Sequence, residues 1–473
     1  MRAVHTIEVR RMRLERSAPT RRGCEAAASL GATVDDLLPT LELPALRLPL
    51  APGDILAIEG PSGSGKSRLL ARVVDALREH GWTVIHLPAR RLLRDVPCVD
   101  LFAEPVEDAM RFLSRAGLGE AACFLRRPGE LSSGQLFRLR LALAMRNAEL
   151  AACRGTPVAL AIDEFASHLD DVTAASVAHL LARWARRDGR IGVIAAASRS
   201  DALDALNPDA RWRAGHAWSG SPALPTQQPP APPPLGSAPA ELLRDLIFEP
   251  GRIADYHELA RLHYRAARPA TVSAVHVARD TRTGDAIGVM VVSMPTLNGA
   301  WRALAWPGRY APLAGTPALP RGTFVERMNR ELRCISRVIV EPRWRGRGVA
   351  TELVRRYLAS PLSKHTEAVA AMGRTCRFFE AAGMRRCALP LGARAARFLD
   401  AMEFCGVERW RLAMPAQALE RAIASRGRAF VEHEVRLWAG ASRAAARHRH
   451  DPLESLFARA CRNAAAERVA YAA

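Results

Sequence analysis

The stretch Gly60-Pro-Ser-Gly-Ser-Gly-Lys66-Ser67 fits the pattern G-x-x-x-x-G-K-[ST]. An apolar run at residues 54–59 precedes it and predicts a strand, and residues 68–78 follow it and predict a helix. A strand, a glycine-rich turn and a helix form the setting in which this pattern binds phosphate. The glycines let backbone N–H groups point at phosphate oxygens, and the helix N-terminus adds partial positive charge. The stretch therefore predicts a phosphate site within an α/β domain.

Lys66 and Ser67 carry the specific chemistry of this loop. The Lys66 ammonium is expected to reach the β- and γ-phosphates of ATP, and the Ser67 hydroxyl to bind Mg²⁺. Only Lys66 and Lys364 are lysines among 68 basic residues, and a compact ammonium fits between phosphates where a planar guanidinium does not. The residues expected to contact the nucleotide are Gly60, Ser62, Gly63, Gly65, Lys66 and Ser67.

Length and composition predict a soluble, multi-domain chain. At 473 residues, with 49% hydrophobic and 25% charged side chains, the sequence can form two or three globular domains. No apolar run approaches the ~20 residues of a membrane span, and the N-terminus has no signal-peptide pattern. The nine cysteines form no C-x-x-C pair, which favours a reducing cytoplasm over disulfides or a zinc site.

A proline-rich segment divides the chain. Residues 219–240 hold eight prolines, and such a segment is expected to be an extended linker. It predicts a first domain at 1–218 and a second domain at 241–410. The Ala- and Arg-rich residues 411–473 are expected to form a basic helical extension.

The net charge of +20 lies mostly in the second half. Residues 241–473 carry 38 basic and 22 acidic side chains, whereas residues 1–240 carry 30 and 26. A basic surface attracts nucleic acid or an acidic partner. The alternative is a genome-wide bias toward arginine, and the scarcity of lysine supports this alternative. The sequence leaves both interpretations open.

Two further motifs follow the phosphate loop in the first half. Leu131-Ser-Ser-Gly-Gln135 precedes a predicted helix, and the apolar run 157–162 leads into Asp163 and Glu164. With the loop, these motifs resemble those of the ABC-type ATPases over residues 40–210. The resemblance assigns Asp163 to Mg²⁺ and Glu164 to the attacking water. It also implies that ATP pairs two copies head to tail, so that a signature loop closes over the partner's nucleotide. That loop comprises Ser132, Ser133, Gly134 and Gln135.

The first half departs from this family in three ways. Ser198 stands where the family has a switch histidine, and no glutamine lies between Lys66 and Gln135. Residues 36–54 also hold no aromatic side chain to stack on the adenine. Slow hydrolysis, or use of ATP as a conformational switch, is therefore expected. His168, which follows the two carboxylates, is expected to be a surface residue.

The second half contains another glycine-bearing turn before a helix. Arg343-Trp-Arg-Gly346-Arg-Gly348 follows a predicted strand at 335–340. With residues 376–384, a predicted hairpin at 274–293 and a leading helix at 255–264, it resembles the GNAT N-acetyltransferases. The resemblance implies an α+β fold over residues 245–410 that binds the pyrophosphate of acetyl-CoA. The residues assigned to acetyl-CoA are Val340, Arg343, Arg345, Gly346, Arg347, Gly348 and Val349.

The acid and base of acyl transfer are not evident. Phe379 stands where the GNAT family has a tyrosine, and a phenyl ring cannot donate a proton. Candidate bases are Glu326, Glu331, Glu341, His263 and Tyr264. Transfer by proximity alone remains an alternative.

The whole chain resembles proteins in which an ABC-type ATPase is fused to a predicted GNAT acetyltransferase. Three functions are compatible with this resemblance. The chain is a nucleotide-gated acyltransferase, a nucleic-acid-associated ATPase whose second domain modifies or binds DNA or RNA, or the ATPase subunit of a transporter. The third is the weakest, because the missing glutamine leaves little sign of docking to a membrane subunit.

Overall fold

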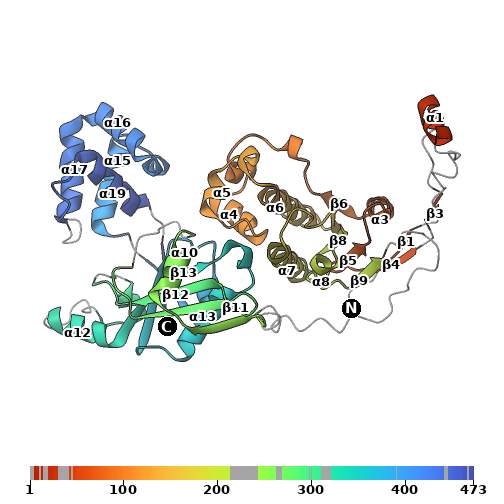
Figure 1. The fold of residues 1–473 in the computed structure, drawn as a ribbon. Helices are drawn as coiled ribbons and strands as arrows, with labels where there is room; N and C mark the ends of the chain where they lie inside the picture. Colours follow the sequence, from red (N-terminus) through yellow and green to blue (C-terminus); the bar gives the residue numbers. More distant parts are fainter. Residues whose placement is uncertain are drawn as a thin grey trace.

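The structure is a computed structural model, shown in Figure 1. It describes residues 5–9, 12–13, 20–29, 42–43, 46–213, 243–262, 269–297, 299, 301–310, 321–389, 391–441, 446–465 and 468–473. The predicted linker at 219–240 lies outside these residues. Within them, the chain forms two sheet-based domains and a separate cluster of helices (Figure 1).

The first domain is built on a five-stranded, all-parallel sheet in the order β6-β7-β8-β5-β9. The strands are β5 (Ile55–Glu59), β6 (Thr83–His86), β7 (Val158–Ile162), β8 (Ile191–Ala197) and β9 (Ala210–Arg213). All residues of β7 and β8 are buried, because helices cover both faces of a parallel sheet. The strands predicted around residues 54–59 and 157–162 are thereby confirmed.

Helices cover the two faces of this sheet. One hydrophobic core packs α3 (Lys66–Glu79) against one face of the sheet. A second, larger hydrophobic core packs the remaining helices against the opposite face. These are α4 (Val106–Arg115), α5 (Ala121–Leu125), α6 (Ser133–Ala152), α7 (Asp171–Asp188) and α8 (Ser200–Asp204). Short 3-10 turns are η1 (Arg90–Leu92), η2 (Cys98–Leu101) and η3 (Pro128–Glu130).

The N-terminal elements lie beside this domain (Figure 1). Strand β1 (His5–Val9) pairs antiparallel with β4 (Leu46–Leu50), and β2 (Met12–Arg13) pairs with β3 (Glu42–Leu43). Helix α1 (Arg21–Ser29) lies between β2 and β3 in sequence.

The second domain is built on a seven-stranded sheet in the order β10-β11-β12-β13-β14-β16-β15. Every neighbouring pair is antiparallel except β13–β14, which is parallel. The strands are β10 (Leu246–Pro250), β11 (Ala274–Asp280), β12 (Ala286–Ser293), β13 (Leu332–Val340), β14 (His365–Ala370), β15 (Arg385–Cys387) and β16 (Val469–Ala472). The helices are α10 (Ile253–Ala260), α11 (Arg302–Ala305), α12 (Arg321–Glu331), α13 (Val349–Ala359) and α14 (Phe378–Ala381), with the 3-10 turn η4 (Pro342–Trp344).

Strands β13 and β14 part in the middle of the sheet. They pair only from Leu332 with His365 to Ile335 with Ala368, although β13 continues to Val340. A register shift at Val291 and Val292 leaves Ser336 without a Cα partner on β12. The sheet therefore opens on the side where the turn at 343–348 leads into α13.

The C-terminal part differs from the helical extension expected at 411–473. A helical cluster begins earlier, at α15 (Ala393–Phe404), and the chain then returns to the sheet as β16, between β14 and β15. The cluster also contains η5 (Arg409–Ala413), α16 (Pro415–Arg426), α17 (Arg428–Gly440) and α19 (Leu453–Ala465). All four residues of β16 are buried. Burial of this short apolar segment therefore favours a strand in the sheet over the helix that the surrounding Ala- and Arg-rich composition predicts.

Among the helices that the structure describes, none combines the length and apolar character needed to cross a membrane.

Candidate functional site

The phosphate loop has the backbone that its glycines predict. Gly63 and Gly65 have φ angles of 79° and 89°, a region that favours glycine. Helix α3 begins at Lys66, directly after Gly65. Lys66 Nζ donates to the Pro61 carbonyl at 2.7 Å, which holds the ammonium against the loop. The loop therefore fits a bound phosphate chain, with a helix N-terminus and a lysine on its inner side.

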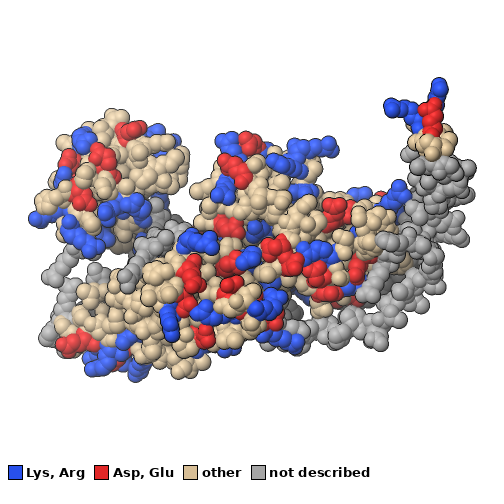
Figure 2. Space-filling view, viewed as in Figure 1, with Lys and Arg blue, Asp and Glu red and all other residues tan. Residues whose placement is uncertain are grey.

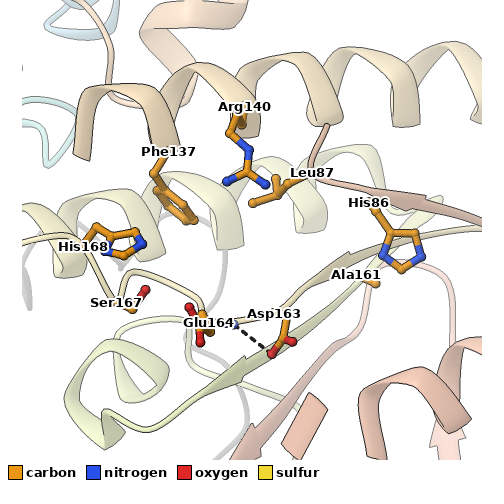
Figure 3. A pocket seen from close by; sticks show the side chains of 9 residues that line it. All are labelled: His86, Leu87, Phe137, Arg140, Ala161, Asp163, Glu164, Ser167 and His168. Atoms are coloured by element: carbon orange, nitrogen blue, oxygen red, sulfur yellow. Dashed lines mark hydrogen bonds between the residues drawn. The ribbon is translucent and has the colours of Figure 1, made fainter. Parts of the chain in front are cut away.

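The two carboxylates that follow β7 open into a cavity of about 260 Å³ (Figure 3). Asp163 and Glu164 are both exposed, and the Glu164 backbone N–H donates to Asp163 Oδ1 at 3.0 Å. They stand at the carboxyl edge of the same parallel sheet whose strand β5 leads into the phosphate loop. Carboxylate oxygens at such an edge suit Mg²⁺.

Two histidines and an arginine line the same cavity, and sequence reasoning did not place them there. His86 ends β6, His168 follows Glu164 in the chain, and Arg140 lies on α6 (Figure 3). Arg140 Nε donates to the Pro88 carbonyl at 2.6 Å and so holds the segment after β6. Burial and the charge of Arg78 lower the pKa of His86. His168 is exposed, as predicted, but it faces this cavity. The position of His86 at the end of a strand was the only signal available.

The segment after Asp163 has an unusual backbone. Glu164 and Ala166 have φ angles of 51° and 59°, which non-glycine residues rarely adopt and which cluster at functional sites. The Phe165 N–H donates to the Ala196 carbonyl at 2.8 Å, which ties the segment to the end of β8. Its last residue, Asp170, caps α7 by accepting from the Thr173 N–H at 3.0 Å. We call residues 163–170 the carboxylate loop.

Arg199 joins the carboxylate loop to the end of β8. It follows Ser198, which is exposed at the position of the expected switch residue. Its guanidinium donates to the Leu169 carbonyl at 2.9 Å and to Asp171 at 2.5 Å. Arg199 therefore links the end of β8 to the N-terminus of α7.

The signature stretch caps α6. Ser132 Oγ accepts from the Gln135 N–H at 3.2 Å, and Gln135 Oε1 accepts from the Ser132 N–H at 3.1 Å. A Cβ at Gly134 would come within 3.2 Å of the His168 carbonyl, so glycine is needed for this close approach. The stretch thus contacts the carboxylate loop of its own chain, while Ser133 remains exposed.

The glycine-bearing turn of the second domain also precedes a helix. Gly346 and Gly348 have φ angles of 84° and 94°, and α13 begins at Val349. Arg345 Nε donates to the Val340 carbonyl at 3.0 Å, which closes the turn. The seven residues assigned to acetyl-CoA are thereby brought together at one helix N-terminus, a fitting place for an anion.

Helix α7 of the first domain contacts this turn. Ser176 Oγ lies 2.5 Å from the Arg343 carbonyl, to which it donates, and it accepts from Arg347 Nε at 2.7 Å. A Cβ at Gly346 would lie 2.7 Å from the Leu180 side chain. Ser176 is 4% exposed, so these hydrogen bonds are shielded from water.

Two further contacts extend this interface. Arg347 donates to the Val172 carbonyl at 2.8 Å, and its guanidinium lies 4.5 Å from the centroid of the Trp344 ring. Arg374 Nη1 lies 3.0 Å from Glu107 Oε1 of α4. The two domains are therefore joined through the turn at 343–348 and through Arg374, which precedes the stretch 376–384.

The candidates for proton transfer are placed as follows. Glu331 accepts from Arg309 Nε at 2.9 Å, and Glu341 accepts from Arg343 Nε at 2.7 Å. His263 and Tyr264 lie outside the described residues. Phe379 packs with Tyr471 of β16 at a ring-centroid distance of 5.0 Å. Burial, with a contribution from Glu380, raises the pKa of Tyr471 to about 12, and its hydroxyl donates to the Gly373 carbonyl at 3.1 Å.

Similar proteins were found for the first domain. Residues 40–194 match the family described as the AAA ATPase domain. The lipoprotein-releasing system ATP-binding protein LolD of Maricaulis maris (strain MCS10) is 30% identical over 192 residues, which cover 33% of this chain and 80% of that protein. The macrolide export ATP-binding/permease protein MacB of Rhodopseudomonas palustris (strain HaA2) is 30% identical over 239 residues, covering 40% of this chain but only 34% of that protein.

Among solved structures, the dimeric structure of MJ0796, a bacterial ABC transporter cassette, is similar with a TM-score of 0.30 and 19% identity. The match covers 37% of this chain and 88% of that chain.

Proposed function

The chain belongs to the ABC-type ATPases, and from that premise we propose that ATP at its first domain controls an acyl-CoA-dependent N-acyltransferase in its second domain. The ATPase domain falls within residues 1–218, and the linker at 219–240 leads to the transferase at 241–410, whose sheet the chain completes with β16. Nine cysteines without a partner cysteine support a reducing cytoplasm as its location.

The residues of the first domain fit ATP and Mg²⁺. Lys66 would offset the charge of the terminal phosphates, and the oxygens of Ser67 and Asp163 would hold the metal ion. Glu164 orients the attacking water from the cavity into which it opens. Bound Mg²⁺ adds positive charge at the phosphate oxygens, which favours attack by water.

The second domain supports acyl-CoA binding through three features. Its sheet opens where β13 and β14 part, its turn at 343–348 leads into a helix N-terminus that suits an anion, and α14 follows β14 in the chain. An acceptor amine at the opening would form the new C–N bond while the thioester C–S bond breaks. The amine loses a proton, and the leaving thiolate takes one. The Tyr471 ring lies 5.0 Å from the Phe379 ring, so we propose the Tyr471 hydroxyl as the donor in place of Phe379.

One observation carries the proposed gating: α7 begins at the carboxylate loop and contacts the turn of the second domain. Asp170 caps α7, and Ser176, two turns further on, bonds to Arg343 and Arg347. A change in the carboxylate loop on ATP binding or hydrolysis therefore moves a helix that touches the acyl-CoA turn. Such coupling is reciprocal, so acyl-CoA changes the affinity for ATP by the same factor.

We also propose that ATP pairs two copies of the chain. Ser133, in the first turn of α6, is exposed next to the carboxylate loop. It is therefore available to a nucleotide held by a second copy. Each chain alone would then carry an incomplete site, and hydrolysis would depend on protein concentration.

Calorimetry tests the proposed function. Acetyl-CoA is titrated into the full chain, with and without a non-hydrolysable ATP analogue. We expect binding in both states with different affinities. Gly346→Asp should abolish it, because the new side chain meets Leu180 and adds negative charge at the turn. Absence of acetyl-CoA binding in both states would exclude the transferase, and equal affinities would exclude the gating.

A further inference from the structure

An arginine-bearing face of α7 continues beyond its contact with the turn. Residues three or four apart share one face of a helix. The contacting residues Ser176 and Leu180 are followed on this face by Arg183 and Arg187, which are both exposed. The two guanidinium groups therefore extend along the domain boundary from the point where the first domain touches Gly346.

Helix α4 brings two more arginines to the same boundary. Glu107, Arg111 and Arg115 are spaced four residues apart and so share a face. Glu107 is the residue that bonds to Arg374 of the second domain at 3.0 Å. Three residues after Arg374, Arg377 stands directly before α14. Each domain thus contributes arginines to one place.

These five residues form what we call the boundary arginine cluster: Arg111, Arg115, Arg183, Arg187 and Arg377.

The boundary arginine cluster has fewer carboxylate partners than arginines. Arg115 pairs with Glu149 at 3.0 Å, and Arg111 pairs with Asp108. Within the described part of the chain, no salt bridge joins Arg183, Arg187 or Arg377 to a carboxylate, which leaves an excess of three positive charges from five arginines and two partners. Burial lowers the pKa of Arg115, and the charges of Arg111, Arg187 and Arg377 lower it further against the opposing effect of Glu149.

We propose that the boundary arginine cluster binds the phosphate groups at the nucleotide end of an acyl-CoA whose pyrophosphate lies at the turn 343–348. The inference rests on the proposed function and adds that the ATPase domain supplies part of the acyl-CoA site. Guanidinium groups match phosphate oxygens in pairs of hydrogen bonds. The 3′-phosphate of coenzyme A is a compact dianion, which suits a local excess of positive charge.

The arrangement of the five arginines favours a small anion over nucleic acid. In Figure 2, blue and red side chains alternate across the visible face of both domains, without a continuous basic track. A nucleic acid needs a stripe of basic residues along its backbone. The cluster instead combines two short helix faces with one turn of the second domain.

The site is complete only when both domains are in contact. A movement of α7 would change the distance of Arg183 and Arg187 from the turn together with that of Ser176. This arrangement gives the proposed gating a direction: contact between the domains strengthens acyl-CoA binding.

Calorimetry with coenzyme A and dephospho-coenzyme A, which lacks the 3′-phosphate, tests this inference on the full chain. The double variant Arg183→Glu/Arg187→Glu is compared with the wild type. Arg462→Glu, an exposed arginine of α19, is the control with a charge reversal in the helical cluster. ATP binding by each variant shows that the first domain is folded.

We expect the wild type and Arg462→Glu to bind coenzyme A more tightly than dephospho-coenzyme A by roughly 10-fold or more. The double variant should bind coenzyme A roughly 10- to 100-fold more weakly and should no longer distinguish the two ligands. Equal affinities of the wild type for both ligands, or a double variant like the wild type, would overturn the inference while leaving acyl-CoA binding intact. A wild type that binds neither ligand would overturn the proposed transferase as well.

Discussion

Removal of the Ser176 hydroxyl should loosen the contact between α7 and the turn of the second domain. In Ser176→Ala, Arg347 Nε loses its acceptor at 2.7 Å, and the Arg343 carbonyl loses its donor. A hydrogen bond to a charged group contributes about 1.5–3 kcal/mol and a neutral one about 1 kcal/mol. Because Arg347 keeps its bond to the Val172 carbonyl, we take the lower part of the summed range, about 2.5–3 kcal/mol. That corresponds to a roughly 70- to 150-fold shift in the docking equilibrium.

Hydrogen–deuterium exchange at the backbone amides of residues 343–349 measures this shift. We expect faster exchange there in Ser176→Ala by about the same factor, because local opening sets the exchange rate. Ser455→Ala, at an exposed position of α19, should leave these amides unchanged. Arg347→Ala should act similarly, and the double variant should add little to it, because both changes remove one shared bond. Unchanged exchange in both single variants would show that α7 does not hold the turn in solution.

Four further outcomes follow from the site. Lys66→Ala should abolish binding of a fluorescent ATP analogue at micromolar concentration, and retained binding would exclude the loop as the phosphate site. Glu164→Gln should keep ATP bound and produce a dimer visible by light scattering, since the amide no longer orients water; a monomer in saturating ATP would contradict the head-to-tail pairing. Tyr471→Phe should lower the rate of acyl transfer roughly 10²- to 10⁴-fold with little change in acetyl-CoA affinity, because only the proton donor is lost, and an unchanged rate would assign the proton to another donor. Burial, with the charges of Arg183, Arg347 and Arg186, lowers the pKa of His179 from 6.5 to about 4, so between these values the unfolded chain binds a proton that the folded chain does not. Its contribution to the free energy of unfolding is therefore full above pH 6.5 and is lost as the pH falls toward 4. The melting temperature of His179→Gln should depend less steeply on pH over this range than that of the wild type. Parallel plots of melting temperature against pH for the two proteins would show that His179 does not cause this pH dependence.

Local sequence determined much of the first domain. Gly63 and Gly65 adopt the left-handed backbone that glycine permits, the following residues favour a helix, and the apolar runs before Asp163 and Ser198 become buried parallel strands. The turn before α13 could be predicted for the same reason. In each case a few adjacent residues dictate the backbone, and the functional groups lie on that backbone.

Tertiary structure alone decided which distant residues meet. His86 and His168 line one cavity because β6 and β7 are neighbours in the sheet. Ser176 bonds to Arg347, 171 residues away. The residues near 469–472, which composition placed in a basic extension, complete the second sheet beside Phe379. Neither helical periodicity nor motif spacing records such contacts, because they depend on how whole faces of helices and sheets bury their apolar area against one another.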